Sequence, residues 1–224
     1  MIKINKCHFT YKNNLQPTLN LKSLHVREGE HLFLHGSSGS GKSTFLNLLC
    51  GILESQGGDI EILKQNFSTL TTRQKDHFRA NHFGIIFQQF NLIPYLSVKE
   101  NILLSLHFSV EKALHVNNKE DEVLRLLDAL ELSNTLLNTP AMQLSVGQQQ
   151  RVAVARALIG KPEIILADEP TSALDLRTKE SFMKLLFNQI NEQKSTLIFI
   201  SHDESLQKNF SHTLDFSKLN KASQ

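Results

Sequence analysis

A glycine-rich loop at residues 36–43, Gly-Ser-Ser-Gly-Ser-Gly-Lys-Ser, restricts the fold of this chain more than any other stretch. The apolar residues 32–34 before it are typical of a short buried strand, and residues 44–49 after it have helical character. Glycines let successive backbone N–H groups point inward, and the N-terminus of a helix adds partial positive charge. A strand, loop and helix in this order therefore predict a binding site for phosphate groups. A flexible glycine–serine linker would need neither the Lys-Ser-Thr of residues 42–44 nor the apolar strand.

The side chains of the loop fit a nucleoside triphosphate with a metal ion. The Lys42 ammonium would reach the β- and γ-phosphates, and the Ser43 hydroxyl would help to hold Mg²⁺. Tyr11, in an early loop, could stack on an adenine ring or could pack against its neighbours, and the residues alone leave both roles open. The candidate nucleotide-binding residues are Tyr11, Gly36, Ser37, Ser38, Gly39, Ser40, Gly41, Lys42, Ser43 and Thr44.

The composition limits the class of protein. The chain has 224 residues, 40% of them hydrophobic, which suits one large or two small globular domains. A formal net charge of +2 argues against a protein that binds nucleic acid mainly through electrostatics. The two cysteines, Cys7 and Cys50, make neither a disulfide framework nor a metal cluster and fit a reducing compartment. No stretch approaches the roughly 20 apolar residues of a membrane span, and the alternating residues 1–6 are not typical of a signal peptide.

Strand-like and helical segments alternate along the chain. Apolar residues at period two predict short strands in residues 1–35 and at 60–62, and the apolar runs at 83–87, 164–167 and 196–200 predict buried strands of a mainly parallel sheet. Helices are predicted at 70–81, 120–132 and 179–194, and Ser145 with Gln148 has the spacing of a capping box that opens a further helix. We expect a catalytic α/β core at about 1–90 and 161–224, and a mostly helical subdomain at about 91–160.

Hydrolysis of a triphosphate needs a metal and an oriented water besides the phosphate loop. Asp168 and Glu169 end the predicted strand at 164–167, so Asp168 suits Mg²⁺ and Glu169 suits orienting or deprotonating the attacking water. Gln88 and His202 end two further predicted strands. Because the carboxyl ends of parallel strands meet at one edge of a sheet, we expect these side chains to sense the γ-phosphate together.

Seven motifs in the family's order give the chain its resemblance to the ATP-binding subunits of ABC transporters, over almost its whole length. They are the aromatic Tyr11, the Walker A loop at 36–43, Gln88 of the Q-loop, the signature Leu-Ser-Val-Gly-Gln at 144–148, the Walker B strand at 164–168 with Glu169, the D-loop Ser-Ala-Leu-Asp at 172–175, and His202. The resemblance implies an α/β fold, that of an ABC ATPase of the P-loop NTPase class. Its parts would be a mainly parallel core sheet, an N-terminal antiparallel β subdomain and the inserted helical subdomain.

The resemblance also implies a role for each matched residue. Tyr11 would stack on adenine, Lys42 and the loop amides would hold the phosphates of ATP, and the residues holding Mg²⁺ would be Ser43, Gln88 and Asp168. Glu169 would be the catalytic carboxylate, with His202 and Gln88 beside it, and Asp175 would belong to the D-loop. The residues contacting the opposite subunit's ATP would be Ser145, Gly147 and Gln148. Two copies, or this chain and a homologous ATPase, would then enclose two ATP molecules. Ser145 could also cap its own helix, and both roles can hold.

Within the family, residues 87–94, Phe-Gln-Gln-Phe-Asn-Leu-Ile-Pro, resemble the LolD/MacB branch, which serves lipoprotein release and macrolide or peptide export. The resemblance implies an integral membrane permease of the FtsX/MacB-like or LolCE-like type as partner, and no nucleic acid. It implies a cytoplasmic location at the inner face of the cell membrane. We expect residues 88–96, with Phe90 and Tyr95 exposed, to dock the permease. The alternative is that these aromatic residues close the core of the helical subdomain.

Two departures from the family pattern bear on activity. The signature has Val146 where glycine is usual, and residues 213–219 lack the usual Asp-Gly-Lys hairpin turn. We expect slower or altered closure from the first departure, and no regulatory domain after the second. The sequence leaves open two alternatives to an exporter: the ATPase of an amino-acid or metal importer, and a poorly hydrolysing ATP-dependent scaffold.

Overall fold

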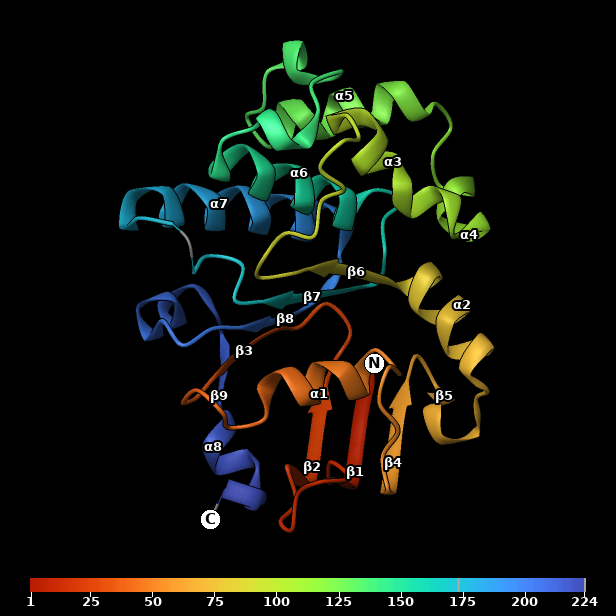
Figure 1. Cartoon of the computed structure of the whole chain (residues 1–224), viewed down its shortest axis with the longest axis vertical. Coiled ribbons are helices and arrows are strands. Elements are labelled where there is room, and N and C mark those ends of the chain that lie inside the picture. Colours follow the sequence, from red (N-terminus) through yellow and green to blue (C-terminus); the bar gives the residue numbers. More distant parts are fainter. Residues whose placement is uncertain (173, 224) are drawn as a thin grey trace. The chain divides into compact units, whose positions relative to one another are not determined.

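A computed structural model describes residues 1–172 and 174–223 of the chain (Figure 1). The chain divides into two compact units: unit 1 comprises Met1–Arg79 and Ile198–Gln224, and unit 2 comprises Ala80–Leu197. None of the described helices combines the length and the apolar character that crossing a membrane requires.

Unit 1 contains an antiparallel sheet built mainly from the start of the chain. Its strands, in spatial order, are β2 (Leu19–Val26), β1 (Ile2–Phe9), β4 (Gly57–Ile62) and β5 (Gln65–Asn66). In β1 the alternation of buried and exposed residues changes phase in the middle of the strand. The change coincides with a positive φ at Lys6 and a register shift between Asn5 and His8 against β4, which together mark a β-bulge. The bulge lets the apolar residues at both ends of β1 face the same buried side.

The rest of unit 1 surrounds β3 (His31–His35), the strand that leads into the glycine-rich loop. β3 runs parallel to β9 (His212–Asp215), and its other neighbour is β8 (Thr196–Ile200), whose last three residues belong to this unit. The ring of Phe33 packs against Phe199 and Phe210, with centroids 6.0 and 5.0 Å away. Helix α1 (Lys42–Leu49) follows the loop. Helix α8 (Phe216–Leu219) follows β9 directly, at the place where the usual hairpin turn is missing.

Unit 2 contains a parallel strand pair covered by helices. β6 (Phe83–Ile86) pairs with β7 (Ile164–Asp168), and the start of β8 lies next to β7. Helix α6 (Val146–Leu158) approaches β6 so closely that a Cβ on Gly84 would lie 2.1 Å from the Ala157 carbonyl oxygen. Helices α3 (Val98–His107), α5 (Lys119–Ala129) and α7 (Leu176–Gln193) all pack against α6 (Figure 1). α6 is therefore the central helix of this unit. Unit 2 also contains α4 (Val110–Leu114) and the 3₁₀ turns Asn134–Leu136 and Ala141–Gln143. The 3₁₀ turns Phe67–Thr69, Glu204–Asn209 and Lys221–Ser223 belong to unit 1, and α2 (Thr72–His82) crosses the boundary between the units.

The predicted fold class is confirmed: an antiparallel N-terminal sheet, parallel strands and a group of helices are all present. The predicted helices at 70–81, 120–132 and 179–194 correspond to α2, α5 and α7. One prediction is wrong. Phe90 is only 7% exposed, because it closes part of the core of unit 2 instead of facing solvent. The division at about residues 91 and 160 stays a prediction.

Candidate functional site

The glycine-rich loop of unit 1 ends at a helix that has no side-chain cap. Within the described residues, α3, α5, α6 and α7 each begin with a side chain that accepts a hydrogen bond from the first turn. α1 instead begins at Gly41, which adopts the left-handed conformation and provides no such side chain. The first backbone N–H groups of a helix lack partners within the helix. At α1 they are therefore left for a ligand, and the helix dipole favours an anion there.

Gly41 occupies a position of the loop where a side chain would not fit. Its φ is +98°, a region that costs other residues energy. A Cβ there would also lie 2.9 Å from Leu19 Cδ2 and 3.0 Å from the Thr18 carbonyl oxygen. The close approach of β2 thus explains this glycine independently of any bound phosphate.

Lys42 lies folded back over its own loop. Its side chain is 9% exposed, and its Nζ donates to the carbonyl oxygens of Gly36, at 2.8 Å, and Ser37, at 2.9 Å. Two carbonyl groups thus hold the ammonium within the loop, where a phosphate oxygen could replace them as the stronger, charge-assisted partner. Ser43 is exposed beside it.

A second feature of the loop is an unsatisfied hydroxyl. Ser40 Oγ is buried and has no hydrogen-bond partner among the described residues. A buried polar atom without a partner costs free energy, so its presence in this loop points to a ligand or to a small rearrangement on binding.

The Tyr11 side chain contacts the first turn of α1 within unit 1. Its hydroxyl is 3.3 Å from Thr44 Oγ1, and its ring meets Phe9 edge-on with centroids 4.9 Å apart. The side chain is still 40% exposed. Packing on one side and exposure on the other leave the ring available for stacking on a base.

In unit 2, β7 ends at Asp168, and the next residue, Glu169, adopts φ of +48°. The left-handed region costs a residue with a side chain about 1–2 kcal/mol, so the surrounding structure must hold it there. Two hydrogen bonds do so: the Ser172 N–H donates to the Glu169 carbonyl at 3.1 Å, and Gln150 Nε2 donates to the Pro170 carbonyl at 2.5 Å. Gln150 comes from α6 and is 1% exposed. Strained residues held in this way cluster at functional sites.

Gln88 lies in an exposed turn two residues beyond the end of β6. The chain then passes through two left-handed residues, Phe90 and Asn91. The Arg156 guanidinium of α6 donates to the carbonyl oxygens of both, at 2.5 and 2.6 Å, and burial lowers the pKa of Arg156. The segment after Gln88 is therefore anchored to α6 by its backbone.

The signature residues open α6. Ser145 and Gln148 form the predicted capping box: each side chain accepts a hydrogen bond from the other residue's backbone N–H. Ser145 is exposed, Val146 is 51% exposed, and a Cβ on Gly147 would meet nothing within 4 Å. The tip of the helix is therefore open to an approaching group.

The remaining predicted residues also follow strands or open helices. Asp175 caps α7, where its carboxylate accepts hydrogen bonds from the backbone and the hydroxyl of Thr178. His202 lies exposed two residues beyond β8, in unit 1. Residue 173 of the predicted D-loop lies outside the described residues.

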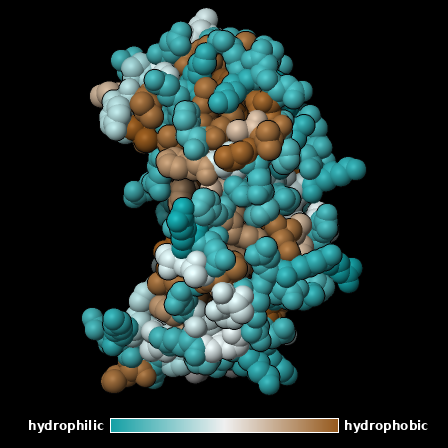
Figure 2. All heavy atoms as spheres, turned by 90° about the vertical axis from the view of Figure 1, so that its right-hand side faces the viewer, coloured by the Kyte–Doolittle hydropathy of each residue, from teal (hydrophilic) through white to brown (hydrophobic). Residues whose placement is uncertain are grey.

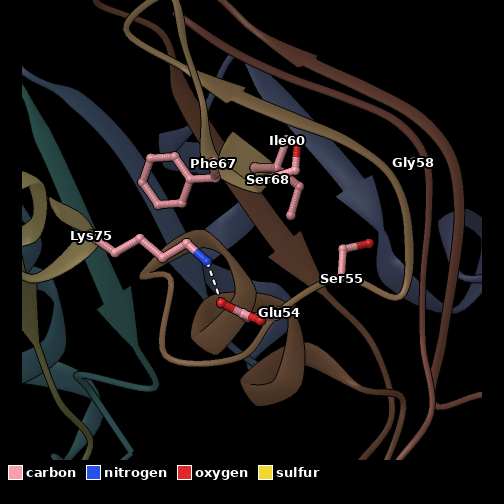
Figure 3. A pocket seen from close by; sticks show the side chains of 7 residues that line it. All are labelled: Glu54, Ser55, Gly58, Ile60, Phe67, Ser68 and Lys75. Atoms are coloured by element: carbon pink, nitrogen blue, oxygen red, sulfur yellow. Dashed lines mark hydrogen bonds and ion pairs between the residues drawn. The ribbon is translucent and has the colours of Figure 1, made fainter. Parts of the chain in front are cut away.

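Unit 1 has a further pocket that is unrelated to the glycine loop (Figure 3). It has a volume of about 100 Å³, and none of the predicted nucleotide-binding residues line it. Lys75, 4% exposed, reaches the Glu54 carboxylate at 2.7 Å, and this hydrogen bond lowers the pKa of Glu54. The buried cation thus already has a carboxylate partner, so the pocket gives no support for a second anion site.

No group of three or more His, Cys, Asp or Glu side chains that could hold a metal occurs in residues 1–172 and 174–223. Proteins often bind Mg²⁺ through one or two carboxylates, with substrate phosphates and water as the other ligands. The predicted ligands Ser43, Gln88 and Asp168 comprise a hydroxyl, an amide and one carboxylate, which is compatible with that mode of binding; that they share one site stays a prediction.

Three residues that form hydrogen bonds with these motif segments were not predicted from the sequence: Gln150, Arg156 and Asn220. Gln150 and Arg156 lie on α6 beside the signature, and Asn220 donates to the Ser40 carbonyl of the glycine loop. Their partners are 20 to 180 positions away in the chain. No local pattern could have identified them.

Comparison with known proteins identifies the family to which the chain is similar. A family described as ABC transporter matches residues 19–172. The ABC transporter ATP-binding protein MJ0796 of Methanocaldococcus jannaschii, described as uncharacterized, is 40% identical over 91% of this chain and 87% of its own length. The macrolide export ATP-binding/permease protein MacB of Rhodopirellula baltica is 37% identical over 84% of this chain, which spans 27% of that longer protein. The dimeric structure of MJ0796 in a post-hydrolysis state, bound to ADP and Pi, superposes with a TM-score of 0.87 at 36% identity, over 100% of this chain and 95% of that one.

Proposed function

The chain belongs to the ABC transporter family, as an ATP-binding and ATP-hydrolysing subunit of the LolD/MacB-like branch, and from this premise we propose that two copies enclose two ATP molecules to drive a membrane permease. The permease would be an exporter or a complex that releases lipoproteins or peptides. The observation that carries the proposal is the uncapped start of α1 at Gly41, with Lys42 held over the loop. It is supported by the dimeric, nucleotide-bound state of the similar MJ0796.

In this mechanism each predicted residue has one task. The N–H groups at the start of α1 and the Lys42 ammonium bind the phosphates, and Tyr11 stacks on the adenine. Mg²⁺, when bound, neutralises charge on the transferring phosphoryl group, and Ser43, Gln88 and Asp168 would hold it. Glu169 orients or deprotonates the attacking water, and His202 contacts the γ-phosphate. The open tip of α6, with Ser145, Gly147 and Gln148, meets the ATP held by the other copy, because a helix N-terminus attracts phosphate.

We assign permease docking to residues 88–96 together with Met142. The Met142 N–H donates to the Pro94 carbonyl, and the Ala141 N–H donates to the Leu96 carbonyl, both at 2.9 Å, so these two segments lie side by side. Tyr95 and Met142 are 74% and 68% exposed. Exposed apolar side chains on an anchored backbone suit a helix of a membrane partner.

A second exposed apolar group in unit 2 is the alternative docking surface. Phe108, Val110 and Leu114, at the end of α3 and on α4, are 69%, 77% and 76% exposed. Apolar surface also gathers over the helices of unit 2 in Figure 2. Co-purification with a co-expressed permease of the proposed type separates the two surfaces. We expect Tyr95→Asp to abolish it and Leu114→Asp to preserve it, and the reverse pattern would move the docking site to α4.

The decisive experiment for the mechanism uses Glu169→Gln. The variant should lose steady-state ATP hydrolysis, keep ATP bound and form a dimer detectable by light scattering. Wild-type hydrolysis in Glu169→Gln would refute the role of the carboxylate, and a monomer at saturating ATP would refute the shared site. A wild-type chain that scarcely hydrolyses ATP even with its permease would favour the scaffold, for which the exposed Val146 at the tip of α6 is the structural argument.

A further inference from the structure

Both the oxygen and the nitrogen of the Asn220 side-chain amide form hydrogen bonds within unit 1. Its side chain is completely buried. The Oδ1 atom accepts from the N–H groups of Asn20, at 2.8 Å, and Ala222, at 3.2 Å. The Nδ2 atom donates to the carbonyl oxygens of Thr18 and Ser40, both at 2.9 Å. Two of these four partners flank Gly41: Ser40 precedes it in the glycine loop, and Thr18 forms part of the wall against which it packs.

The turn that carries Asn220 also supports the other end of the loop. Phe216 is fully buried, and its ring centroid lies 5.3 Å from that of Phe45 on α1. A Cβ on Gly36 would lie 3.3 Å from Ser217 Oγ and 3.4 Å from Phe216 Cβ. The beginning and the end of the glycine loop therefore both rest on residues 216–220, which follow β9 in Figure 1.

Holding the Ser40 carbonyl has a direct consequence for the loop. The Ser40 C=O and the Gly41 N–H belong to one planar, trans peptide group, so they point in opposite directions. A donor that hydrogen-bonds to the Ser40 carbonyl therefore also fixes the direction in which the Gly41 N–H points. Gly41 starts α1 without a side-chain cap, so its N–H is one of the donors that a phosphate would meet.

We propose that Asn220 is a positioning residue for phosphate binding: its amide orients the Ser40–Gly41 peptide group so that the loop N–H groups face the nucleotide. The proposal rests on the proposed function in assuming that this loop binds nucleotide. It also explains how the chain manages without the usual hairpin turn after β9. In place of that turn, residues 216–220 pack beneath the loop and supply the amide.

Asn101 provides a matched control. It is also completely buried, and its amide likewise bonds only to backbone groups: Oδ1 accepts from the Ile93 N–H at 2.8 Å, and Nδ2 donates to the carbonyl oxygens of Ile93, Leu96 and Ser97. Asn101 belongs to α3 in unit 2 and none of its bonds reaches the glycine loop. Asparagine to aspartate keeps the size and the acceptor but removes both N–H donors. The same substitution at the two sites therefore separates a specific effect on the loop from a general loss of stability.

The experiment measures the affinity of the full chain for MgADP by calorimetry, because ADP carries the phosphates that meet the loop and is not turned over. We expect Asn220→Asp to raise the Kd for MgADP at least tenfold. Asn101→Asp should keep a Kd within twofold of wild type. Urea unfolding, measured on both variants, should show a lower midpoint for each, so a loss of stability alone would not explain the change in Kd. Asn220→Ala, which removes the donors without adding a charge, should match Asn220→Asp and serves if the aspartate variant does not fold.

Two results would overturn the proposal: wild-type affinity in the folded Asn220 variants, or an equal loss of affinity in Asn101→Asp. If the wild-type chain does not bind MgADP, the proposed function fails instead, so the two failures remain distinguishable.

Discussion

Replacing Lys112 with methionine should remove a rise in the free energy of unfolding that we expect the wild-type chain to show above pH 8. Lys112 lies on α4, is 3% exposed, and donates from its Nζ to the Phe83 carbonyl at 2.6 Å. Burial lowers the pKa of Lys112 from 10.5 to about 8, and the nearby Glu163 carboxylate offsets part of that change. The ammonium is therefore much less favourable in the folded chain than in the unfolded one.

The sign and the size of the effect follow from proton binding. Below pH 8 the amine is charged in both states, and the folded state carries the full cost of burying the charge. Between pH 8 and 10.5 the unfolded chain keeps the proton and the folded chain has released it, so stability rises with pH. The distance between the two pKa values corresponds to about 3 kcal/mol at roughly 1.4 kcal/mol for each pH unit.

The assay is urea unfolding of wild type and Lys112→Met at pH 7, 8, 9 and 10. Other groups titrate in this range, but they do so in both proteins and cancel in the difference between the two unfolding free energies. That difference should move in favour of wild type by about 2–3 kcal/mol between pH 7 and 10. Lys218→Met, at a side chain 86% exposed, should show no such change and serves as the control. A difference for Lys112→Met that stays flat across these pH values would refute the reasoning.

Three further predictions follow from the contacts. Gln150→Met removes the hydrogen bond to the Pro170 carbonyl that holds the turn after Glu169. The variant should lower kcat about tenfold, a cost of roughly 1.4 kcal/mol, and leave the KM for ATP little changed. Equal kcat in variant and wild type would contradict this. Glu54→Gln should cost about 1 kcal/mol in urea unfolding, because it leaves the buried Lys75 ammonium without its carboxylate, and Lys75→Met should cost less; the opposite order would be evidence against the pairing. Cys7 is buried and burial raises its pKa, so a thiol reagent at pH 8 should modify it only after unfolding, as followed by mass spectrometry.

Much of this protein could be predicted from short stretches of the chain. Some features depend only on residues that are close together in the sequence. They are the amphipathic stripe of α5, the capping box of α6 and the apolar runs of β7 and β8, and their patterns are therefore visible in the sequence. The glycine loop belongs to the same class, because a strand, a loop and a helix in succession need no distant partner. These local features were enough to predict a mainly parallel α/β arrangement and the phosphate loop, whereas the ABC ATPase fold and the roles of the signature and D-loop residues came from the resemblance to the family.

Other features depend on contacts between distant parts of the chain. Phe90 has the sequence context of an exposed loop residue, yet Arg156, 66 positions away, anchors its backbone and the side chain is buried. Asn220 reaches Ser40 across 180 positions, and Gln150 reaches the turn after Glu169 from a neighbouring helix. A single asparagine or glutamine has no periodicity, and its hydrogen bonds take shape only when the packing of apolar faces brings a particular carbonyl within reach. Hydrophobic pattern therefore sets the elements, whereas the polar contacts that hold the glycine loop and the turn after Glu169 arise from how those elements pack.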